Sequence, residues 1–328
     1  MFNRLCLLFS YHYIRASRAF EEAVLALAPY CDVLIDSGAF SDHYGGLAAA
    51  KQGRKHNPIN IDEYIEACRR YHGKVWQYIM LDVIKNPGAS RANLERMTDA
   101  GLRPMPVFVY PESYDRIPHM VEVNEHICVP GGASKTTRRF MWQRFQRAYE
   151  ASDRKARIHG LGFVRWPDMF HLPLYSVDSS SWSTGGRFGS IVKFGGEGGM
   201  ISFADSKNVH KPEQRKYLLD NGVTVDQLYD PIWMRRHNGI PTLFTVFAYL
   251  QAQHYCRPRR PHLFLAVVNL SWLVNLIACI AAGTPGHFDY RTACGVRERL
   301  NSLSKTPDRQ ADMMIDVLKG RTKWEVLE

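Results

Sequence analysis

The sequence predicts an α/β fold, specifically a (β/α)8 barrel, from three observations. Short apolar runs recur through the first 180 residues, helical patterns lie between them, and the links that join the two are short. Strand-then-helix alternation with short links is typical of a parallel sheet. About seven such units favour a closed barrel over an open sheet, and 328 residues accommodate a barrel of roughly 250 residues with additions.

Each predicted strand is apolar and is followed by small or polar residues. Helices are expected from Asp62, as the N-cap, to Gly73, from Ser90 to Gly101, and onward from about Thr136. The predicted strands are Leu5–Phe9, Val33–Ile35, Val75–Leu81, Met105–Val109, His126–Val129, the residues around Ile158, and Leu174–Val177.

The pattern changes after Asp178. Residues 179–210 are rich in serine and glycine, which predicts an insertion with short strands, and residues 225–328 are expected to be a mainly helical closing part of one catalytic domain spanning 1–328. The uncharged segment 263–282 is long enough to cross a bilayer. Because Asn269 and Asn275 interrupt it, a buried helix is the preferred interpretation, and no membrane partner is expected.

Composition points to a polyanionic partner and a reducing compartment. The net charge of +10 and the pI of about 9.3 favour a nucleic acid, although a soluble basic enzyme is the alternative. Seven scattered cysteines form no C-x-x-C pair, and the apolar run near the N-terminus is too short for a signal peptide. The expected location is the cytoplasm.

Three acids follow predicted strands: Asp36, Asp82 and Asp178. A single acid in this position is often only a helix N-cap. In a barrel, however, the carboxyl ends of all strands meet at the mouth that carries catalytic groups, so three acids there are more informative. Paired carboxylates suit chemistry at the anomeric carbon of a sugar. Glycines after two other strands would let a flat ligand approach the backbone, or would simply form tight turns.

Five short motifs, in order over residues 31–182, resemble the tRNA-guanine transglycosylase family. "DSGAF" at Asp36 is similar to the D-S-G-G-[FY] motif of the family, and "MLDVI" at Asp82 is similar to its second acidic strand end. "VPGGAS", "IHGLG" and "YSVDSSSW" resemble the G-G-L, M-G-[VI]-G and nucleophile segments. The family is a (β/α)8 barrel that exchanges guanine for a 7-deazaguanine without breaking the nucleic-acid chain.

The resemblance implies a role for each motif. Asp178 would be the nucleophile at C1′ of the target nucleotide, and Asp36 would be the general acid/base for the ring proton of the base. Asp82 would accept hydrogen bonds from the guanine edge. The remaining residues that the resemblance places at the substrate are Ser37, Gly38, Phe40, Gly131, Gly132, His159 and Gly160.

Two departures from the family modify the expectation. The zinc motif of the tRNA enzymes is missing, and Cys256 with His254 and His262 is a poor substitute, so no metal and no cofactor are expected. The shorter form with "DSGAFS" resembles the phage and bacterial DNA-guanine transglycosylase branch, whose products protect phage genomes from restriction.

The expected activity is therefore insertion of a 7-deazaguanine, such as 7-cyano-7-deazaguanine, into DNA in a host cytoplasm. The alternatives are a tRNA-modifying enzyme, a noncatalytic nucleic-acid-binding partner subunit, and a nucleoside hydrolase. The protein is expected to be a monomer or a homodimer, since the zinc region that contributes to the dimer of the tRNA enzymes is absent.

Basic and aromatic residues are candidates for nucleic-acid binding. On the helix expected after the paired glycines, some of the arginines Arg138, Arg139, Arg144 and Arg147 would reach phosphates, unless they form an ordinary solvated face. In the insertion, Trp182 and Arg187 would stack on or clamp the nucleotide, and Lys193 would extend the positive region.

Overall fold

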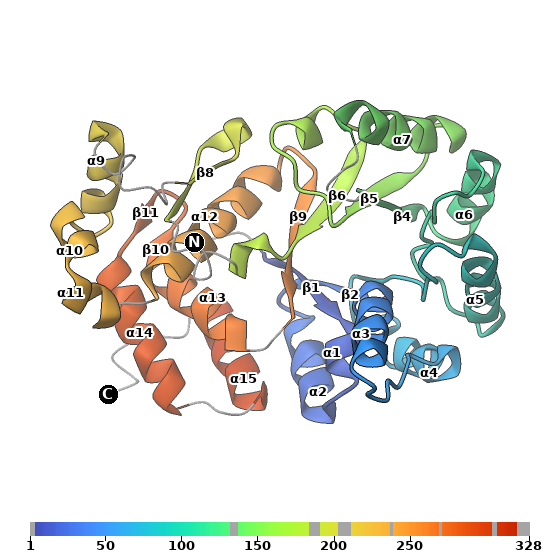
Figure 1. The fold of residues 1–328 in the computed structure, drawn as a ribbon, viewed down its shortest axis with the longest axis horizontal. Helices are drawn as coiled ribbons and strands as arrows, with labels where there is room; N and C mark the ends of the chain where they lie inside the picture. Colours follow the sequence, from blue (N-terminus) through green and yellow to red (C-terminus); the bar gives the residue numbers. More distant parts are fainter. Residues whose placement is uncertain are drawn as a thin grey trace. The chain divides into compact units, whose positions relative to one another are not determined.

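Seven strands form one curled sheet in an α/β architecture, which confirms the predicted class at this coarser level (Figure 1). The computed structural model describes residues 4–131, 137–183, 191–202, 211–236, 239–268, 271–303 and 307–319. The strand order is β3-β2-β1-β9-β6-β5-β4, and the sheet is parallel. The strands are β1 (Cys6–Ser10), β2 (Asp32–Asp36), β3 (Gln77–Tyr78), β4 (His126–Pro130), β5 (Arg157–Leu161), β6 (Leu174–Ser179) and β9 (His262–Val267).

The predicted strand Met105–Val109 is present as two isolated bridges. Met105 pairs with Ile79, just beyond β3, and Val107 pairs with Cys128 in β4. The N–H of Met105 donates to the carbonyl of Tyr78 at 2.9 Å, and the N–H of Cys128 donates to the carbonyl of Pro106 at 2.7 Å. A proline has no N–H to donate, and prolines occupy positions 104 and 106, so this segment makes few ladder bonds. It nevertheless links the two edge strands of the sheet.

Helices follow the strands along the chain, and α4, α5, α6 and α7 succeed one another around the outside of the sheet (Figure 1). Two predicted helix starts were wrong: the side chains of Asn60 and Asn86, not those of Asp62 and Ser90, cap the following helices. Asp62 lies instead in the first turn, where an acid favours the helix dipole. The elements here are α1 (Tyr11–Ile14), α2 (Arg18–Leu27), α3 (Ala39–Lys51), α4 (Ile61–Tyr71), α5 (Pro87–Asp99), η1 (Tyr114–Arg116), α6 (Ile117–Val123), α7 (Arg138–Ala151) and η2 (Asp168–Phe170).

An aromatic cluster fills the sheet interior near the amino ends of its strands. The ring of Trp76, just before β3, stacks on that of Tyr175 in β6, with centroids 6.4 Å apart. Trp76 also packs against Phe264 of β9, with centroids 5.0 Å apart. Bulky side chains therefore occupy one end of the sheet, while small and polar residues collect at the carboxyl ends.

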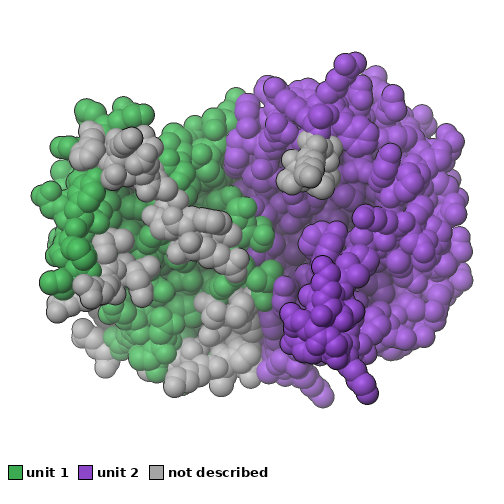
Figure 2. Space-filling model, viewed as in Figure 1, with its two compact units in different colours: residues 1–5, 180–259, 267–328 green, residues 6–179, 260–266 purple. Residues whose placement is uncertain are grey.

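The chain divides into two compact units (Figure 2). Unit 2 comprises residues 6–179 and 260–266 and contains nearly all of the curled sheet, while unit 1 comprises residues 1–5, 180–259 and 267–328. Unit 1 contains η3 (Ser181–Ser183), the antiparallel pair β7 (Val192–Phe194) and β8 (Met200–Ser202) with η4 (Gly196–Gly198) between them, α9 (Pro212–Asp220), α10 (Val225–Tyr229), α11 (Pro231–Arg236), α12 (Ile240–Cys256), α13 (Ser271–Ala281), the small pair β10 (Gly283–Thr284) and β11 (His287–Phe288), α14 (Tyr290–Leu303) and α15 (Pro307–Leu318).

The sequence suggested that segment 263–282 is one buried helix, and this prediction was wrong. The first part of the segment belongs to strand β9, and its later part is α13. β9 lies between β1 and β6, and a strand with neighbours on both sides and buried faces reads as a continuous apolar run, like a buried helix. Among the helices of the described ranges, none is long and apolar enough to cross a membrane.

Candidate active site

Three acids from different parts of the chain lie at or near the carboxyl ends of strands of the sheet. Asp36 ends β2, Asp178 is the penultimate residue of β6, and Asp82 follows β3 by four residues. The thiol of Cys128, fully buried in β4, has its pKa raised well above the ordinary value by burial and by the charges of all three acids. Hydrogen bonds link the surroundings of two of the acids: the N–H of Gly38 donates to Asp36, and the hydroxyl of the adjacent Ser37 donates to Asp82.

Asp178 is held by two neighbours on β5 and the turn that follows it. The N–H of Gly162 donates to Asp178 Oδ1 at 2.6 Å, and His159 Nε2 lies 3.3 Å from the same oxygen. His159 is fully buried, and its Nδ1 shares a hydrogen bond with Ser176 Oγ at 2.8 Å. Gly162 has a φ of +63°, which glycine adopts without strain. The turn therefore aims a backbone donor at the carboxylate.

Asp36 has an unusually basic carboxyl group. Burial, followed by the charge of Asp178, raises its pKa from 3.8 to about 6, and the Gly38 N–H and the Ser10 hydroxyl offset this in part. The Gly38 N–H donates to Asp36 Oδ2 at 3.0 Å. Gly38 has a φ of +81°, and a Cβ there would lie 2.6 Å from the backbone nitrogen of His12. Only glycine therefore fits this position of the predicted motif.

Asp82 is supported from the same motif. The Ser37 hydroxyl donates to Asp82 Oδ1 at 3.4 Å and accepts a bond from the Ala39 N–H at 3.3 Å. Burial, followed by the charge of Asp36, raises the pKa of Asp82 to about 7. Ser37 is completely buried, so it orients Asp82 and does not itself meet a ligand, contrary to the expectation that it would bind substrate.

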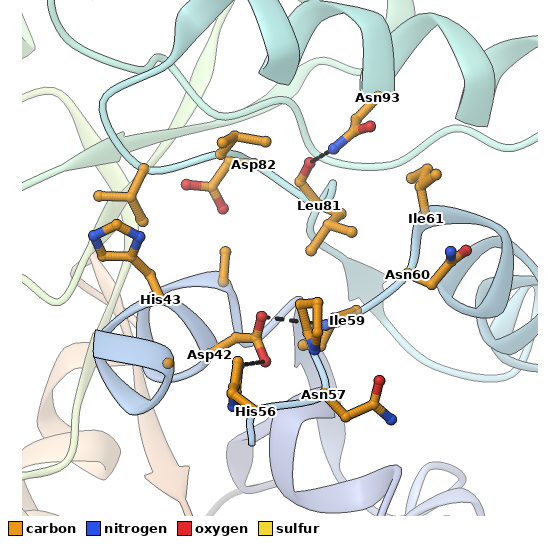
Figure 3. Close-up of a pocket in the computed structure, with 15 residues that line it drawn as sticks. Asp42, His43, His56, Asn57, Ile59, Asn60, Ile61, Leu81, Asp82 and Asn93 are labelled. Carbon is orange, nitrogen blue, oxygen red and sulfur yellow. Dashed lines mark hydrogen bonds and ion pairs between the residues drawn. The ribbon is translucent and has the colours of Figure 1, made fainter. Parts of the chain in front are cut away.

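A pocket of about 580 Å³ within unit 2 opens beside Asp82 (Figure 3). Its walls come from α3, from residues 56–61 and from residues 81–84. Asp42 of α3 joins two of these walls: its Oδ2 accepts the Ile59 N–H at 3.2 Å, and its Oδ1 lies 3.1 Å from His56 Nε2 (Figure 3). Asp42 and His56 were not predicted from the sequence, because their pairing depends on how the loop of residues 56–61 folds back on α3 and leaves no local signal.

Gly131 and Gly160, two of the glycines expected at the substrate, face other parts of the protein. The Gly131 N–H donates to the carbonyl of Leu161 at 3.0 Å, so it is not available to a base, and Gly132 lies outside the described residues. A Cβ on Gly131 would lie 2.8 Å from Phe163, and one on Gly160 would lie 3.3 Å from the same side chain. Both glycines make room for Phe163. His159, also expected at the substrate, is buried behind Asp178.

The four arginines of α7 that were expected to bind nucleic acid differ in exposure and in their partners. Arg138 pairs with Asp168 at 3.0 Å, and Arg139 and Arg147 are exposed. Arg144 is buried and donates to the Pro130 carbonyl, so it does not face solvent.

Trp182, in the insertion, was expected to stack on the nucleotide. It is fully buried and packs against Trp272, with ring centroids 5.3 Å apart, so its ring is not available for stacking. The ammonium group of Lys193 lies over the ring of Tyr217. Arg187 lies outside the described residues.

No group of three or more histidine, cysteine or acidic side chains in the described residues is arranged to hold a metal ion. Comparison with known proteins gives no relative: no family model, no curated protein and no solved structure matches the chain. Function is therefore inferred from the geometry of the three acids and from the motifs around them.

Proposed function

We propose that this protein is a DNA-guanine transglycosylase, which replaces guanine in DNA with a 7-deazaguanine such as 7-cyano-7-deazaguanine. The observation that carries the proposal is that Asp36, Asp82 and Asp178 lie at or near the carboxyl ends of strands of one sheet, with hydrogen bonds from Gly38 and Ser37 holding two of them. In catalysis at a sugar carbon, two carboxyl groups take separate roles: one acts as the nucleophile and the other as the general acid/base.

The proposed scaffold is a complete (β/α)8 barrel. The support for it is the segment around Met105 and Val107, which bridges to the residue after β3 on one side and to β4 on the other. Counted as an eighth strand, this segment would close the sheet into a ring. The three acids would then lie at the carboxyl mouth, where barrel enzymes carry their catalytic groups.

In the first step, a carboxylate oxygen of Asp178 forms a bond to C1′ of the target nucleotide as the C1′–N9 bond breaks. Both contacts to Asp178 within the described residues involve Oδ1, so we assign the attack to Oδ2. The electron pair of the broken bond leaves with guanine, which takes a proton from Asp36. The phosphodiester chain stays intact.

In the second step, the incoming deazaguanine gives its N9 proton to the Asp36 carboxylate and attacks C1′, which releases Asp178. Two displacements at one carbon retain the original configuration. A pKa of about 6 suits Asp36 for both directions of proton transfer, because an acid/base works best when its pKa lies near the working pH.

Asp82 would select the guanine-type base. Its ionised carboxylate would accept hydrogen bonds from N1–H and from the exocyclic amine, and the pocket beside it has room for a base. Because burial raises the pKa of Asp82 to about 7, binding of the base would displace a proton from this group at neutral pH.

The choice of DNA over tRNA rests on the resemblance of "DSGAFS" to the DNA branch, while the charge of +10 supports either polymer. Both substrates require the base to leave the stack. The test is incorporation of radiolabelled guanine into duplex DNA and into unmodified tRNA. Asp178→Ala is the inactive variant, and Asp62→Ala, which removes an exposed acid from the first turn of α4, is the matched control.

Label in DNA that requires Asp178 supports the proposal. Label in tRNA alone assigns the protein to tRNA modification. Tight DNA binding without exchange indicates a noncatalytic partner subunit, and release of guanine from free nucleosides indicates a hydrolase.

A further inference from the structure

Helix α3 exposes a stripe of large apolar side chains beside the acids. Phe40, Tyr44 and Leu47 are 66%, 44% and 49% exposed. Their spacing of four and three residues places them on one face of the helix. The rings of Phe40 and Tyr44 are in contact, with centroids 4.5 Å apart. Large exposed apolar side chains that gather on one face mark an interaction surface more often than a solvated one.

The stripe borders the pocket. Asp42 and His43 of α3 line the pocket (Figure 3), and the ring of His43 contacts that of Tyr44, with centroids 5.1 Å apart. The buried residues of the helix are Ala39 and Ala49. The helix begins directly after Gly38, whose N–H contacts Asp36. The stripe therefore starts at the candidate catalytic group and leads away from it.

A cluster of exposed basic residues lies at the far end of the helix: Lys51, Arg54 and Lys55. The only acid in residues 39–58 is Asp42, which already contacts His56 and Ile59. From Phe40 to Lys51 the helix extends roughly 16 Å at 1.5 Å per residue. That length corresponds to about five nucleotides at 3.4 Å per nucleotide of one strand.

We propose that this face of α3 binds the nucleic-acid strand that flanks the target nucleotide, an inference that rests on the proposed function. Tyr44 stacks on an unpaired neighbouring base, and Lys51, Arg54 and Lys55 contact the phosphates beyond it. Exposed aromatic side chains on a helix that leads to exposed basic residues suit single-strand recognition, because every base has a face that can stack and every nucleotide carries a phosphate.

The test is fluorescence anisotropy with a labelled 12-nucleotide single-stranded DNA, read over a range of salt concentrations. Tyr44→Ala is expected to raise Kd by about fivefold or more, the effect of losing one stacked base, and Tyr44→Trp is expected to restore it. The triple replacement of Lys51, Arg54 and Lys55 by glutamine is expected to lower the slope of log K against log salt by about 2, since each single-strand phosphate contact contributes about 0.7.

Two controls fall outside the surface. Tyr229→Ala removes a tyrosine of similar exposure, 46%, from α10 of unit 1. Lys74→Gln removes an exposed lysine that precedes β3, at the amino edge of the sheet. Neither variant is expected to change Kd or the salt slope, and circular dichroism verifies that each protein is folded.

The outcomes separate this inference from the proposed function. If the Tyr44→Ala variant and the triple variant both keep the Kd and the salt slope of the wild type, the inference is overturned, even if base exchange persists. Loss of affinity on Tyr44→Ala in a protein that shows no exchange on any polymer supports the surface and overturns the proposed function. A change of oligomeric state in light scattering, with unchanged DNA affinity, assigns the stripe to a second copy of the chain and overturns the inference.

Discussion

Replacing Asp36 by asparagine should stabilise the folded protein at neutral and basic pH while it abolishes base exchange. In the native protein, a carboxylate at this position is poorly solvated and lies near the charge of Asp178. Asparagine has almost the same shape, carries no charge, and keeps an oxygen that can accept the Gly38 N–H. A group retained for catalysis can therefore cost the fold stability.

The magnitude follows from the pKa of Asp36, which is 3.8 for an ordinary aspartate and about 6 in the folded protein. A difference of about two pKa units, at about 1.4 kcal/mol each, raises the free energy of unfolding of Asp36→Asn above that of the wild type by about 3 kcal/mol above pH 6. This is an upper value, because Asp36 keeps some solvent contact. The folded protein holds this proton to higher pH than the unfolded chain, so the wild type loses stability as pH rises from about 4 to about 6. The gain should therefore be only about 1 kcal/mol at pH 4.5.

Urea denaturation of the wild type, Asp36→Asn and the control Asp62→Asn at pH 4.5 and pH 8 measures these differences. Asp62 is exposed and paired with Arg96, and an exposed pair contributes at most about 1 kcal/mol, so its variant should not gain stability. The reasoning is refuted if Asp36→Asn is no more stable than the wild type at pH 8, or if its advantage is the same at both pH values.

Gly38→Ala should lower the free energy of unfolding by at least about 2 kcal/mol, because it combines a positive φ with a clash against the His12 backbone; Gly53→Ala, with φ +63° in open space, should cost only about 1 kcal/mol. His159→Gln should lower kcat with little change in KM and should alter the pH–rate profile; an unchanged profile would exclude a positioning role. Affinity for free guanine, measured by calorimetry, should rise about tenfold from pH 6 to pH 8 as Asp82 ionises. Asp82→Asn should abolish that rise, and a rise that persists would contradict the assigned role.

Most strands and helices, and the acids that follow strands, could be predicted from the amino-acid sequence. The runs that end at Asp36 and Asp178 became β2 and β6, because a short apolar run followed by small or polar residues is a local signal. Gly38 was expected at the substrate through the resemblance, but its positive φ and its hydrogen bond to Asp36 were seen only in the structure. Helix caps were less predictable: several polar residues near each start can act as the cap.

The contacts between side chains from distant parts of the chain could not be predicted without the folded structure. Trp182 is in the core, Arg144 is buried, and Gly131 donates its N–H to a neighbouring segment, although each was expected at the substrate or on the surface. The apolar segment 263–282 includes a strand because β1 and β6, from distant parts of the sequence, lie on either side of it. Local propensity sets the type of most elements, but burial and the partners of a polar group depend on strand order. Strand order is set by packing over the whole chain.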